Sequence, residues 1–215
     1  MYHIKEMFYT LQGEGAHSGR PAVFCRFTGC NLWSGREADR ATAVCTFCDT
    51  DFVGTDGQNG GRFKAADLLA DRIASLWPDA VKGEPYVVCT GGEPLLQLDA
   101  PLIQALHDRH FSVGVETNGT VPAPEGVDWL CLSPKGNSRI VLTHCDELKL
   151  VFPQPEAPPE RFAALPATHY YLSPMNPVDG TIATDSNAVQ AAVRYCLDNP
   201  QWRLTLQSHK LLGID

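Results

Sequence analysis

Three of the eight cysteines have a spacing that could bind a metal centre. Cys30, Cys45 and Cys48 form a C-x14-C-x2-C pattern. A [4Fe-4S] cluster usually takes four cysteine thiolates, so three would hold the cluster and leave one iron open to another molecule. A structural zinc ion is the alternative, with a fourth cysteine or a histidine such as His17 or His144 completing the site. The spacing alone leaves both metal centres open.

Polar residues follow three apolar, strand-like segments of the chain. Thr90–Pro94 contains paired glycines, which let a ligand approach backbone N–H and C=O groups, although a plain turn before a helix is the alternative. Glu116–Gly119 and Ser133–Lys135 could likewise be ligand-binding residues, caps or solvated loops. The carboxyl ends of parallel strands meet at one edge of a sheet, and the chemistry of α/β folds concentrates there. We therefore expect the three segments to lie together.

Two features near the N-terminus suit the recognition of a small polar molecule. Tyr9–Gly15 combines the amide of Gln12 with the carboxylate of Glu14, a donor and acceptor set for the edge of a heterocycle, although a hairpin turn is the alternative. Arg26 lies between two apolar residues of a strand-like segment. A buried arginine needs an anionic partner, so Arg26 should pair with either a structural carboxylate or a substrate carboxylate.

Composition limits the class of protein. The 215 residues, 44% of them hydrophobic and 20% charged, predict one domain, residues 1–215, with one sizeable core. The net charge of −8 argues against a nucleic-acid partner, including an RNA-binding role, because no broad basic surface can form. Residues 1–6 do not resemble a secretion signal, and no apolar run reaches membrane-spanning length. We therefore expect no membrane partner and a cytoplasmic location, where cysteines stay mostly reduced.

Short β-rich segments alternate with longer amphipathic segments, which predicts an α/β fold with a mainly parallel sheet and covering helices. A complete eight-stranded βα barrel needs about 250 residues, so we expect a partial, incomplete TIM-like βα barrel of about six mainly parallel strands. The strand-like segments are Pro21–Phe27, Tyr86–Cys89, Ser112–Glu116, Trp129–Leu132, Glu147–Phe152, His169–Leu172 and Arg203–Leu206. The helix-like segments are Lys64–Trp77, Pro94–Arg109 and Ser186–Asp198, the last capped by Asp185 or Ser186. The loops are Gly54–Arg62 and Pro153–Pro159.

Over nearly its whole length the sequence resembles the radical S-adenosylmethionine (SAM) enzymes, and within them the 7-carboxy-7-deazaguanine synthase family of queuosine and 7-deazapurine biosynthesis. The segments that carry the resemblance are Tyr9–Gly15, Arg26–Leu32, Cys45–Thr50, Thr90–Pro94 and Glu116–Gly119. The common superfamily motif is C-x3-C-x2-C. This chain is similar to a subset of the synthase family in widening the first gap, so its insert, residues 31–44, should modify the cluster-binding loop without removing a ligand.

The resemblance implies a lyase that converts 6-carboxy-5,6,7,8-tetrahydropterin to 7-carboxy-7-deazaguanine with loss of ammonia. One electron from the cluster would cleave SAM, and the resulting 5'-deoxyadenosyl radical would take hydrogen from C6 of the pterin. SAM would be regenerated after each turnover. The resemblance also implies a homodimer, a flavodoxin- or ferredoxin-type electron donor, and Mg²⁺ as a second metal.

The resemblance assigns residues to four roles. The [4Fe-4S] ligands are Cys30, Cys45 and Cys48, and the Mg²⁺ ligand is Thr50. The SAM-binding residues are Phe47, Asp49, Gly91, Gly92, Glu93, Ser133, Pro134, Lys135, Ser173, Pro174, Met175 and Asn176. The substrate-binding residues are Leu11, Gln12, Gly13, Glu14, Arg26, Thr90 and the terminal Asp215. The tail segment Gln207–Lys210 is also similar to the family, which implies that the C-terminus lies near the active site.

Two other functions use the same cysteines. A radical SAM activase acting on a protein partner would share the cluster, but it needs a groove for a peptide. Gln12, Arg26 and Thr50 instead suit a small carboxylated heterocycle. A non-enzymatic zinc-binding module would use the cysteines without iron.

Overall fold

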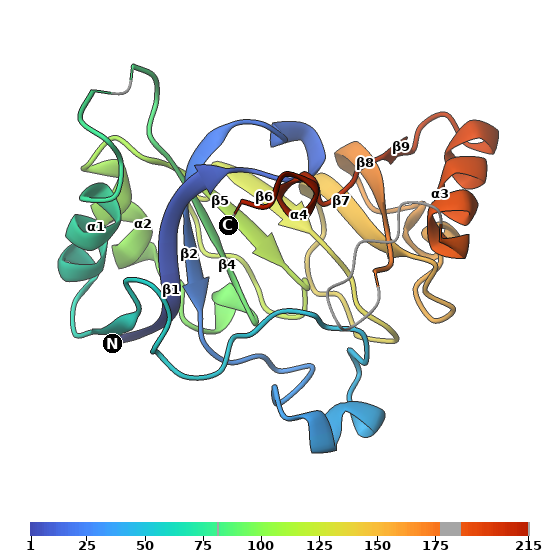
Figure 1. Ribbon diagram of the computed structural model, residues 1–215, viewed down its shortest axis with the longest axis horizontal. Helices are drawn as coiled ribbons and strands as arrows, with labels where there is room; N and C mark the ends of the chain where they lie inside the picture. Colours follow the sequence, from blue (N-terminus) through green and yellow to red (C-terminus); the bar gives the residue numbers. More distant parts are fainter. Residues whose placement is uncertain (81, 177–185, 215) are drawn as a thin grey trace.

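The body of the protein is one sheet of nine strands, within residues 1–80, 82–176 and 186–214 that the computed structural model describes. The strands are β1 (Tyr2–Leu11), β2 (Pro21–Phe27), β3 (Gly61–Phe63), β4 (Tyr86–Gly91), β5 (Ser112–Thr117), β6 (Trp129–Leu132), β7 (Cys145–Phe152), β8 (Ala167–Pro174) and β9 (Arg203–Leu204). They pair in the order β3-β1-β2-β4-β5-β6-β7-β8-β9 (Figure 1). Neighbours from β2 to β9 are parallel, whereas β1 is antiparallel to β2 and β3. The two edges do not meet, so the sheet is an open, partial barrel.

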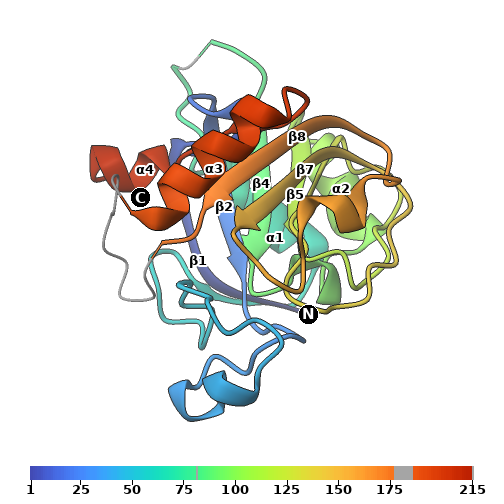
Figure 2. The same ribbon diagram turned by 90° about the vertical axis from the view of Figure 1, so that its right-hand side faces the viewer.

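Helices cover the outside of this curved sheet. The α-helices are α1 (Ala66–Ala74), α2 (Ala100–His107), α3 (Asn187–Asp198) and α4 (Ser208–Leu212), and the 3₁₀ turns are η1 (Gly15–His17), η2 (Glu37–Thr42), η3 (Pro94–Leu96) and η4 (Pro159–Phe162). Figures 1 and 2 show α1 and α2 packed together at one end of the sheet and α3 against β8 at the other. No helix in the described ranges is long and apolar enough to cross a membrane.

The two faces of each parallel strand have different environments because successive side chains point to opposite sides. In β7, Leu148 and Leu150 are fully buried in the main hydrophobic core beneath the helices. Glu147 and Lys149 alternate with them and point into the open barrel. Cys89 and Thr90 of β4 repeat the pattern, with Cys89 in the core and Thr90 facing inward. The outer face therefore stabilises the fold, and the inner face is left for a site.

The sequence predicts about six strands, and the larger number comes mainly from the N-terminal edge of the sheet. β1 was not predicted because two charged residues, Lys5 and Glu6, interrupt its apolar pattern. Both are paired in the fold: Lys5 Nζ lies 2.8 Å from the Asp51 carboxylate, and Glu6 Oε1 accepts a 2.8 Å hydrogen bond from Arg26 Nε. β3 lies partly within the predicted loop Gly54–Arg62.

One predicted helix is wrong, because Pro94–Arg109 divides into η3 and α2. Glu93 begins the first by accepting a 3.0 Å hydrogen bond from Leu95 N, and Asp99 begins the second by accepting one of 3.1 Å from Leu102 N. Each carboxylate satisfies a backbone donor that the first turn leaves unpaired, so each starts a separate helix. At the start of α3, Ser186 is the cap, while Asp185 lies outside the described residues.

Gly91 and Gly92 end β4 where it lies tightly against the segment that follows β2. Gly91 has a φ of +143°, and a Cβ there would lie 2.3 Å from the Phe27 carbonyl oxygen. A Cβ on Gly92 would lie 2.1 Å from the Gly29 carbonyl oxygen. Only glycine allows this approach, which brings Gly92 beside the loop that carries Cys30.

Gly92→Ala should therefore destabilise the fold. Accommodating the methyl group requires a backbone shift, which costs about 1–3 kcal/mol. Gly61→Ala is a matched control, because its Cβ would meet only the Phe63 ring, at an ordinary 3.6 Å. Thermal unfolding of cluster-free protein should show a clearly lower Tm for Gly92→Ala than for the control. Equal Tm values would show that the two segments are not closely packed.

Candidate active site

A single cavity of about 260 Å³ brings the predicted site residues together at the carboxyl ends of the parallel strands. Every predicted site residue in the described structure lines it, except Glu93 and Pro134. The predicted Asp215 lies outside the described residues. The polar segments after β4, β5 and β6 all reach the same cavity, as the parallel arrangement predicts.

The three cysteines of the C-x14-C-x2-C pattern all line this cavity. Cys30 Sγ accepts a hydrogen bond from Leu32 N at 3.4 Å, although burial raises the pKa of its thiol. The thiol of Cys45 donates to the sulfur of Cys48, which lowers the pKa of Cys48 to about 6 and raises that of Cys45. Cys48 is thus the thiol most easily converted to a thiolate, the form that binds metal.

The arrangement of donors fits an iron-sulfur cluster better than a zinc ion. Within the described ranges, no three His, Cys, Asp or Glu side chains are close enough to bind one metal ion together. His17 packs on Trp129 and His144 is exposed, and neither lines the cavity. A cluster distributes its cysteine ligands over separate irons, so three thiols around an open cavity suit it.

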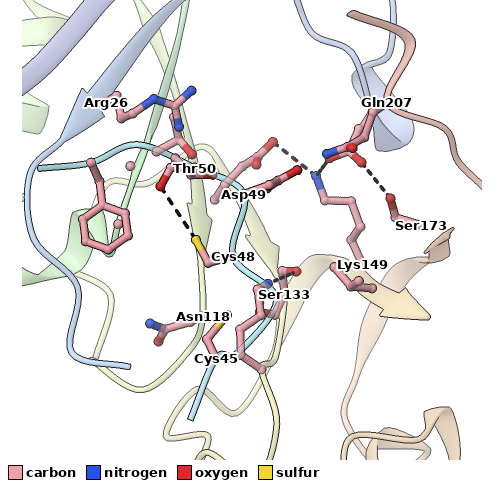
Figure 3. Close-up of a pocket in the computed structure, with 18 of the residues that line it drawn as sticks. Arg26, Cys45, Cys48, Asp49, Thr50, Asn118, Ser133, Lys149, Ser173 and Gln207 are labelled. Carbon is pink, nitrogen blue, oxygen red and sulfur yellow. Dashed lines mark hydrogen bonds and ion pairs between the residues drawn. The ribbon is translucent and has the colours of Figure 1, made fainter. Parts of the chain in front are cut away.

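A buried ionic group lines the same cavity. Lys149 Nζ lies 2.7 Å from Glu14 Oε2 and 3.4 Å from Glu116 Oε1, and its side chain is 5% exposed. Ser173 Oγ donates to Glu14 at 2.8 Å, and Gln12 Nε2 donates to Glu116 at 3.0 Å. Figure 3 shows Lys149 and Ser173 on one side of the cavity, with Cys45 and Cys48 nearer its centre. These contacts fix the Gln12 amide and the Glu14 carboxylate, which the sequence analysis matched to the edge of a heterocycle.

The charges in this group keep one another ionised. Burial opposes ionisation of Glu14, but the charge of Lys149 and hydrogen bonds from Lys149 and Ser173 outweigh it and lower the pKa of Glu14. Burial would likewise lower the pKa of Lys149, but Glu116 and Glu14 raise it well above its usual value. Glu14 and Glu116 thus share one ammonium.

Sequence reasoning missed Lys149 as a site residue and gave Glu116 no individual role. The signal was present in β7, where Glu147 and Lys149 alternate with leucines. Polar residues at every second position of a strand indicate a polar inner face. Reading the strand as simply apolar concealed them.

Arg26 lines the cavity beside Thr90, its direct partner across β2 and β4. Its Nε donates to Glu6 Oε1 at 2.8 Å, which is the structural carboxylate that the sequence allowed. Within the described part of the chain, its two Nη groups have no hydrogen-bond partner. Arg26 can therefore be held by one carboxylate and still bind a second.

Thr50 lines the cavity between two acidic residues that are already paired. Asp49 forms a 2.6 Å ion pair with Lys210, and Asp51 forms one of 2.8 Å with Lys5. The carboxylates on either side of Thr50 are thus paired with lysines. The Thr50 hydroxyl is the side-chain oxygen of this segment that remains for a ligand in the cavity.

The C-terminal segment closes one side of the cavity, as the resemblance implied. Ser208 N and Oγ both donate to the Gly13 carbonyl, at 3.1 and 2.7 Å. Gln207 and His209 line the cavity, and the His209 ring occupies the space that a Cβ on Gly13 would need. Burial lowers the pKa of His209. Neither Gln207 nor His209 was individually predicted as a contact.

Glu93 and Pro134 support the cavity from behind. The Glu93 side chain is fully buried and accepts hydrogen bonds from Thr117 Oγ1 at 2.7 Å and from Asn118 N at 2.8 Å. Burial raises the pKa of Glu93. The Pro134 carbonyl accepts a hydrogen bond from Gln154 Nε2. Glu93 therefore acts through the end of β5, where Asn118 lines the cavity.

Comparison with known proteins identifies the family. The chain is 61% identical to 7-carboxy-7-deazaguanine synthase from Bordetella pertussis over 213 residues, which cover 99% of both chains. It is 60% identical to the Caulobacter vibrioides enzyme of the same name, again over 99% of both. The chain belongs to the 7-carboxy-7-deazaguanine synthase family. Its fold is similar to the crystal structure of QueE from Escherichia coli, with a TM-score of 0.71 and 28% identity over 97% of this chain and 94% of that one. No family model matches the chain.

The 7-carboxy-7-deazaguanine synthases are radical SAM enzymes of queuosine biosynthesis, so the family brings a [4Fe-4S] cluster and SAM. The three cysteines that line one cavity agree with that chemistry, because three thiolates would leave one iron of a [4Fe-4S] cluster without a protein ligand. Neither the activase nor the zinc-binding module is favoured, because relatives matched over 99% of the chain carry the synthase name.

Lys149→Met should destabilise the protein by about 3 kcal/mol, because it leaves the largely buried Glu14 and the partly exposed Glu116 without their cation. Without Lys149, burial would raise the pKa of Glu14 above its unfolded value. The stability deficit relative to the unsubstituted protein should therefore be largest near neutral pH and shrink as pH falls and Glu14 is protonated. Denaturant unfolding at several pH values measures both effects.

Two further variants control this experiment. Lys64 is exposed, so Lys64→Met should change the unfolding free energy by less than about 0.5 kcal/mol. Adding Glu14→Gln to Lys149→Met removes the carboxyl group whose pKa is raised. The loss of unfolding free energy in the double variant should therefore vary less with pH. A Lys149→Met deficit that is independent of pH would contradict the ionic coupling.

Proposed function

We propose that this protein is a radical SAM lyase that converts 6-carboxy-5,6,7,8-tetrahydropterin to 7-carboxy-7-deazaguanine with loss of ammonia. The observation that supports this most strongly is that one cavity is lined both by the three cysteines and by the ionic group around Lys149. The cysteines suit the cluster, and the ionic group suits a polar heterocycle. Membership of the synthase family supports the use of both in one reaction.

The ionic group suits the edge of a pterin. The carboxylates of Glu14 and Glu116 accept hydrogen bonds from ring N–H and amino groups, while Gln12 offers both an acceptor and donors. The Nη groups of Arg26 suit the substrate carboxylate, which a guanidinium can bind with two parallel hydrogen bonds. In this proposal Leu11, Gly13 and Thr90 contact the ring from the cavity wall.

When bound, the reduced cluster and SAM together supply the 5'-deoxyadenosyl radical that starts the reaction. Cys30, Cys45 and Cys48 would hold the cluster. The backbone of Gly91 and Gly92, which line the cavity, suits the amine and carboxylate of the methionine part. The rest of SAM would lie against the other predicted residues that line the cavity, which are Phe47, Asp49, Ser133, Lys135, Ser173, Pro174, Met175 and Asn176.

The main task of the chain is to hold the pterin in one position while water is kept out. The ionic group is buried and its members are tied to one another, so their geometry is set before substrate arrives. The contact between Ser208 and Gly13 lets the C-terminal segment cover the substrate side. This rigid arrangement keeps the substrate next to SAM throughout turnover.

The proposal includes Mg²⁺ at Thr50. Because Asp49 and Asp51 are paired with lysines, the site would offer one hydroxyl rather than a cage of carboxylates. Mg²⁺ is often bound in this way, with water and substrate oxygens completing its six ligands. The carboxylate of the pterin is a suitable source.

A homodimer, a flavodoxin- or ferredoxin-type electron donor and a cytoplasmic location complete the proposal. All three are supported by the family resemblance alone. Light scattering of the purified protein tests the dimer, and reduction of the cluster by each class of donor in turn tests the electron source.

Anaerobic turnover of the reconstituted protein tests the reaction. The assay contains dithionite, SAM, Mg²⁺ and 6-carboxy-5,6,7,8-tetrahydropterin, and mass spectrometry follows the products. We expect 7-carboxy-7-deazaguanine, with none formed by Cys45→Ala, which should also lose its cluster. If only 5'-deoxyadenosine and methionine form, the radical chemistry stands and the substrate is wrong. If iron-loaded protein gives neither, the radical assignment fails.

Thr50→Ala should keep the cluster but weaken Mg²⁺-dependent turnover, raising the Mg²⁺ concentration for half-maximal rate several-fold. Thr46→Ala is a matched control, since it removes a hydroxyl from the same segment at an exposed position that does not line the cavity. Iron content confirms that both variants hold the cluster. An unchanged Mg²⁺ dependence in Thr50→Ala would refute the assignment.

A further inference from the structure

The insert between Cys30 and Cys45 is a folded unit rather than a loose loop. It projects from the body of the protein in Figures 1 and 2, where η2 forms its outer end. Its base is closed by the Leu32 carbonyl, which accepts hydrogen bonds from Val44 N at 3.1 Å and Cys45 N at 3.3 Å. Trp33 is 8% exposed, and its ring packs edge-on against Phe52.

Arg40 connects this insert to the segment that carries two of the cluster ligands. Its guanidinium lies over the Trp33 ring, 4.1 Å from the centroid, and its Nε donates to Glu37 at 2.8 Å. Nη1 donates to the carbonyls of Thr46 at 3.1 Å and Cys48 at 2.9 Å. The Arg40 side chain is only 16% exposed.

The carbonyls that Arg40 binds belong to a segment without regular secondary structure. Cys45–Thr50 contains neither helix nor strand, so its backbone groups need partners from elsewhere. Arg40 bridges two carbonyls of the Cys45-x2-Cys48 turn and is itself fixed by an aromatic ring and a carboxylate. This arrangement restricts the directions in which Cys45 and Cys48 present their sulfurs.

The same contact puts a positive charge next to Cys48. A cluster gains one negative charge on reduction, so a nearby cation stabilises the reduced form more than the oxidised form. Glu37 weakens this effect without cancelling it, because its carboxylate is 76% exposed and well solvated. Through Arg40, the insert therefore both fixes the backbone of the Cys45–Cys48 segment and adds a positive charge that favours reduction.

We propose that Arg40 is a positioning residue for the [4Fe-4S] cluster, which fixes the Cys45–Cys48 turn and favours reduction of the cluster. The proposal rests on the cluster and is independent of the substrate. It also gives the widened cysteine spacing a purpose, since the insert brings Arg40 to the ligand turn.

Three variants test the proposal. Arg40→Met keeps much of the length and removes the charge and donors, and Arg40→Lys keeps the charge without the guanidinium fork. Arg36→Met is the matched control, because Arg36 is an exposed arginine of the same insert whose side chain forms no hydrogen bond, ion pair or cation–π contact in the described ranges. All are reconstituted anaerobically without substrate. The measurements are iron per chain, the rate of iron loss to a chelator, and the midpoint potential from a titration followed by electron paramagnetic resonance.

Arg40→Met should lose iron roughly 10-fold faster than the unsubstituted protein, as expected for a residue that orients metal ligands. Its midpoint potential should also move to a more negative value. Arg36→Met should match the unsubstituted protein in both measurements. Arg40→Lys should keep a near-normal potential but lose iron faster.

An Arg40→Met potential equal to that of Arg36→Met would overturn the proposal, even if iron were lost quickly, because Arg40 would then have only a structural role. If Arg40→Met takes up no cluster, Arg40→Lys decides the matter. A near-normal potential in Arg40→Lys would support the proposal. A strongly shifted potential, or a folded chain without a cluster, would overturn it.

Discussion

A buried ammonium shared by two carboxylates allows the inside of this open barrel to be charged. Unpaired charges largely removed from water cost several kcal/mol each. Glu14 therefore depends on Lys149 and Ser173, and Glu116 depends on Lys149 and Gln12. The group also joins distant parts of the chain, since Glu14 follows β1, Glu116 is in β5 and Lys149 is in β7. The pairing of these charges therefore ties β5, β7 and the segment after β1 to one another. β7 also carries Glu147. Burial raises the pKa of Glu147, and its carboxylate accepts a hydrogen bond from Ala16 N at 2.9 Å.

The sequence was sufficient where one strand face or one strand end carried the signal. Trp129–Leu132 was predicted with the bounds of β6, because a buried parallel strand is a short apolar run between turn residues. The polar segments after the strands were brought together for the same geometric reason. The partners of Lys149 could not be predicted, because Glu14 and Glu116 lie far from it in the sequence. A lysine in an apolar strand gives no indication of which carboxylates will surround it.

Tyr9–Gly15 shows how one segment can be a hairpin connection and also line a cavity. The segment begins the antiparallel connection from β1 to β2, where Gln12 N donates to the Arg20 carbonyl at 2.8 Å and Gly19 N donates to that of Gln12 at 2.7 Å. The hairpin alternative is therefore correct. The side chains of the same turn line the cavity, because β1 adds an antiparallel edge beside the parallel strands. A turn fixed by its backbone leaves its side chains available for binding.

Residues 45–51, which include Cys45 and Cys48, are held by cations from three separate parts of the chain. Arg40 from the insert binds the Cys48 carbonyl, Lys210 from the C-terminal segment pairs with Asp49, and Lys5 from β1 pairs with Asp51. These contacts differ in strength, since the Asp51 side chain is 70% exposed and its pair is screened by solvent, whereas Asp49 and Lys210 are each less than one-third exposed. A segment without helix or strand thus gains its fixed shape from its surroundings. This explains why the cysteine spacing alone could suggest a metal centre but could not describe the geometry in which the cysteines are held.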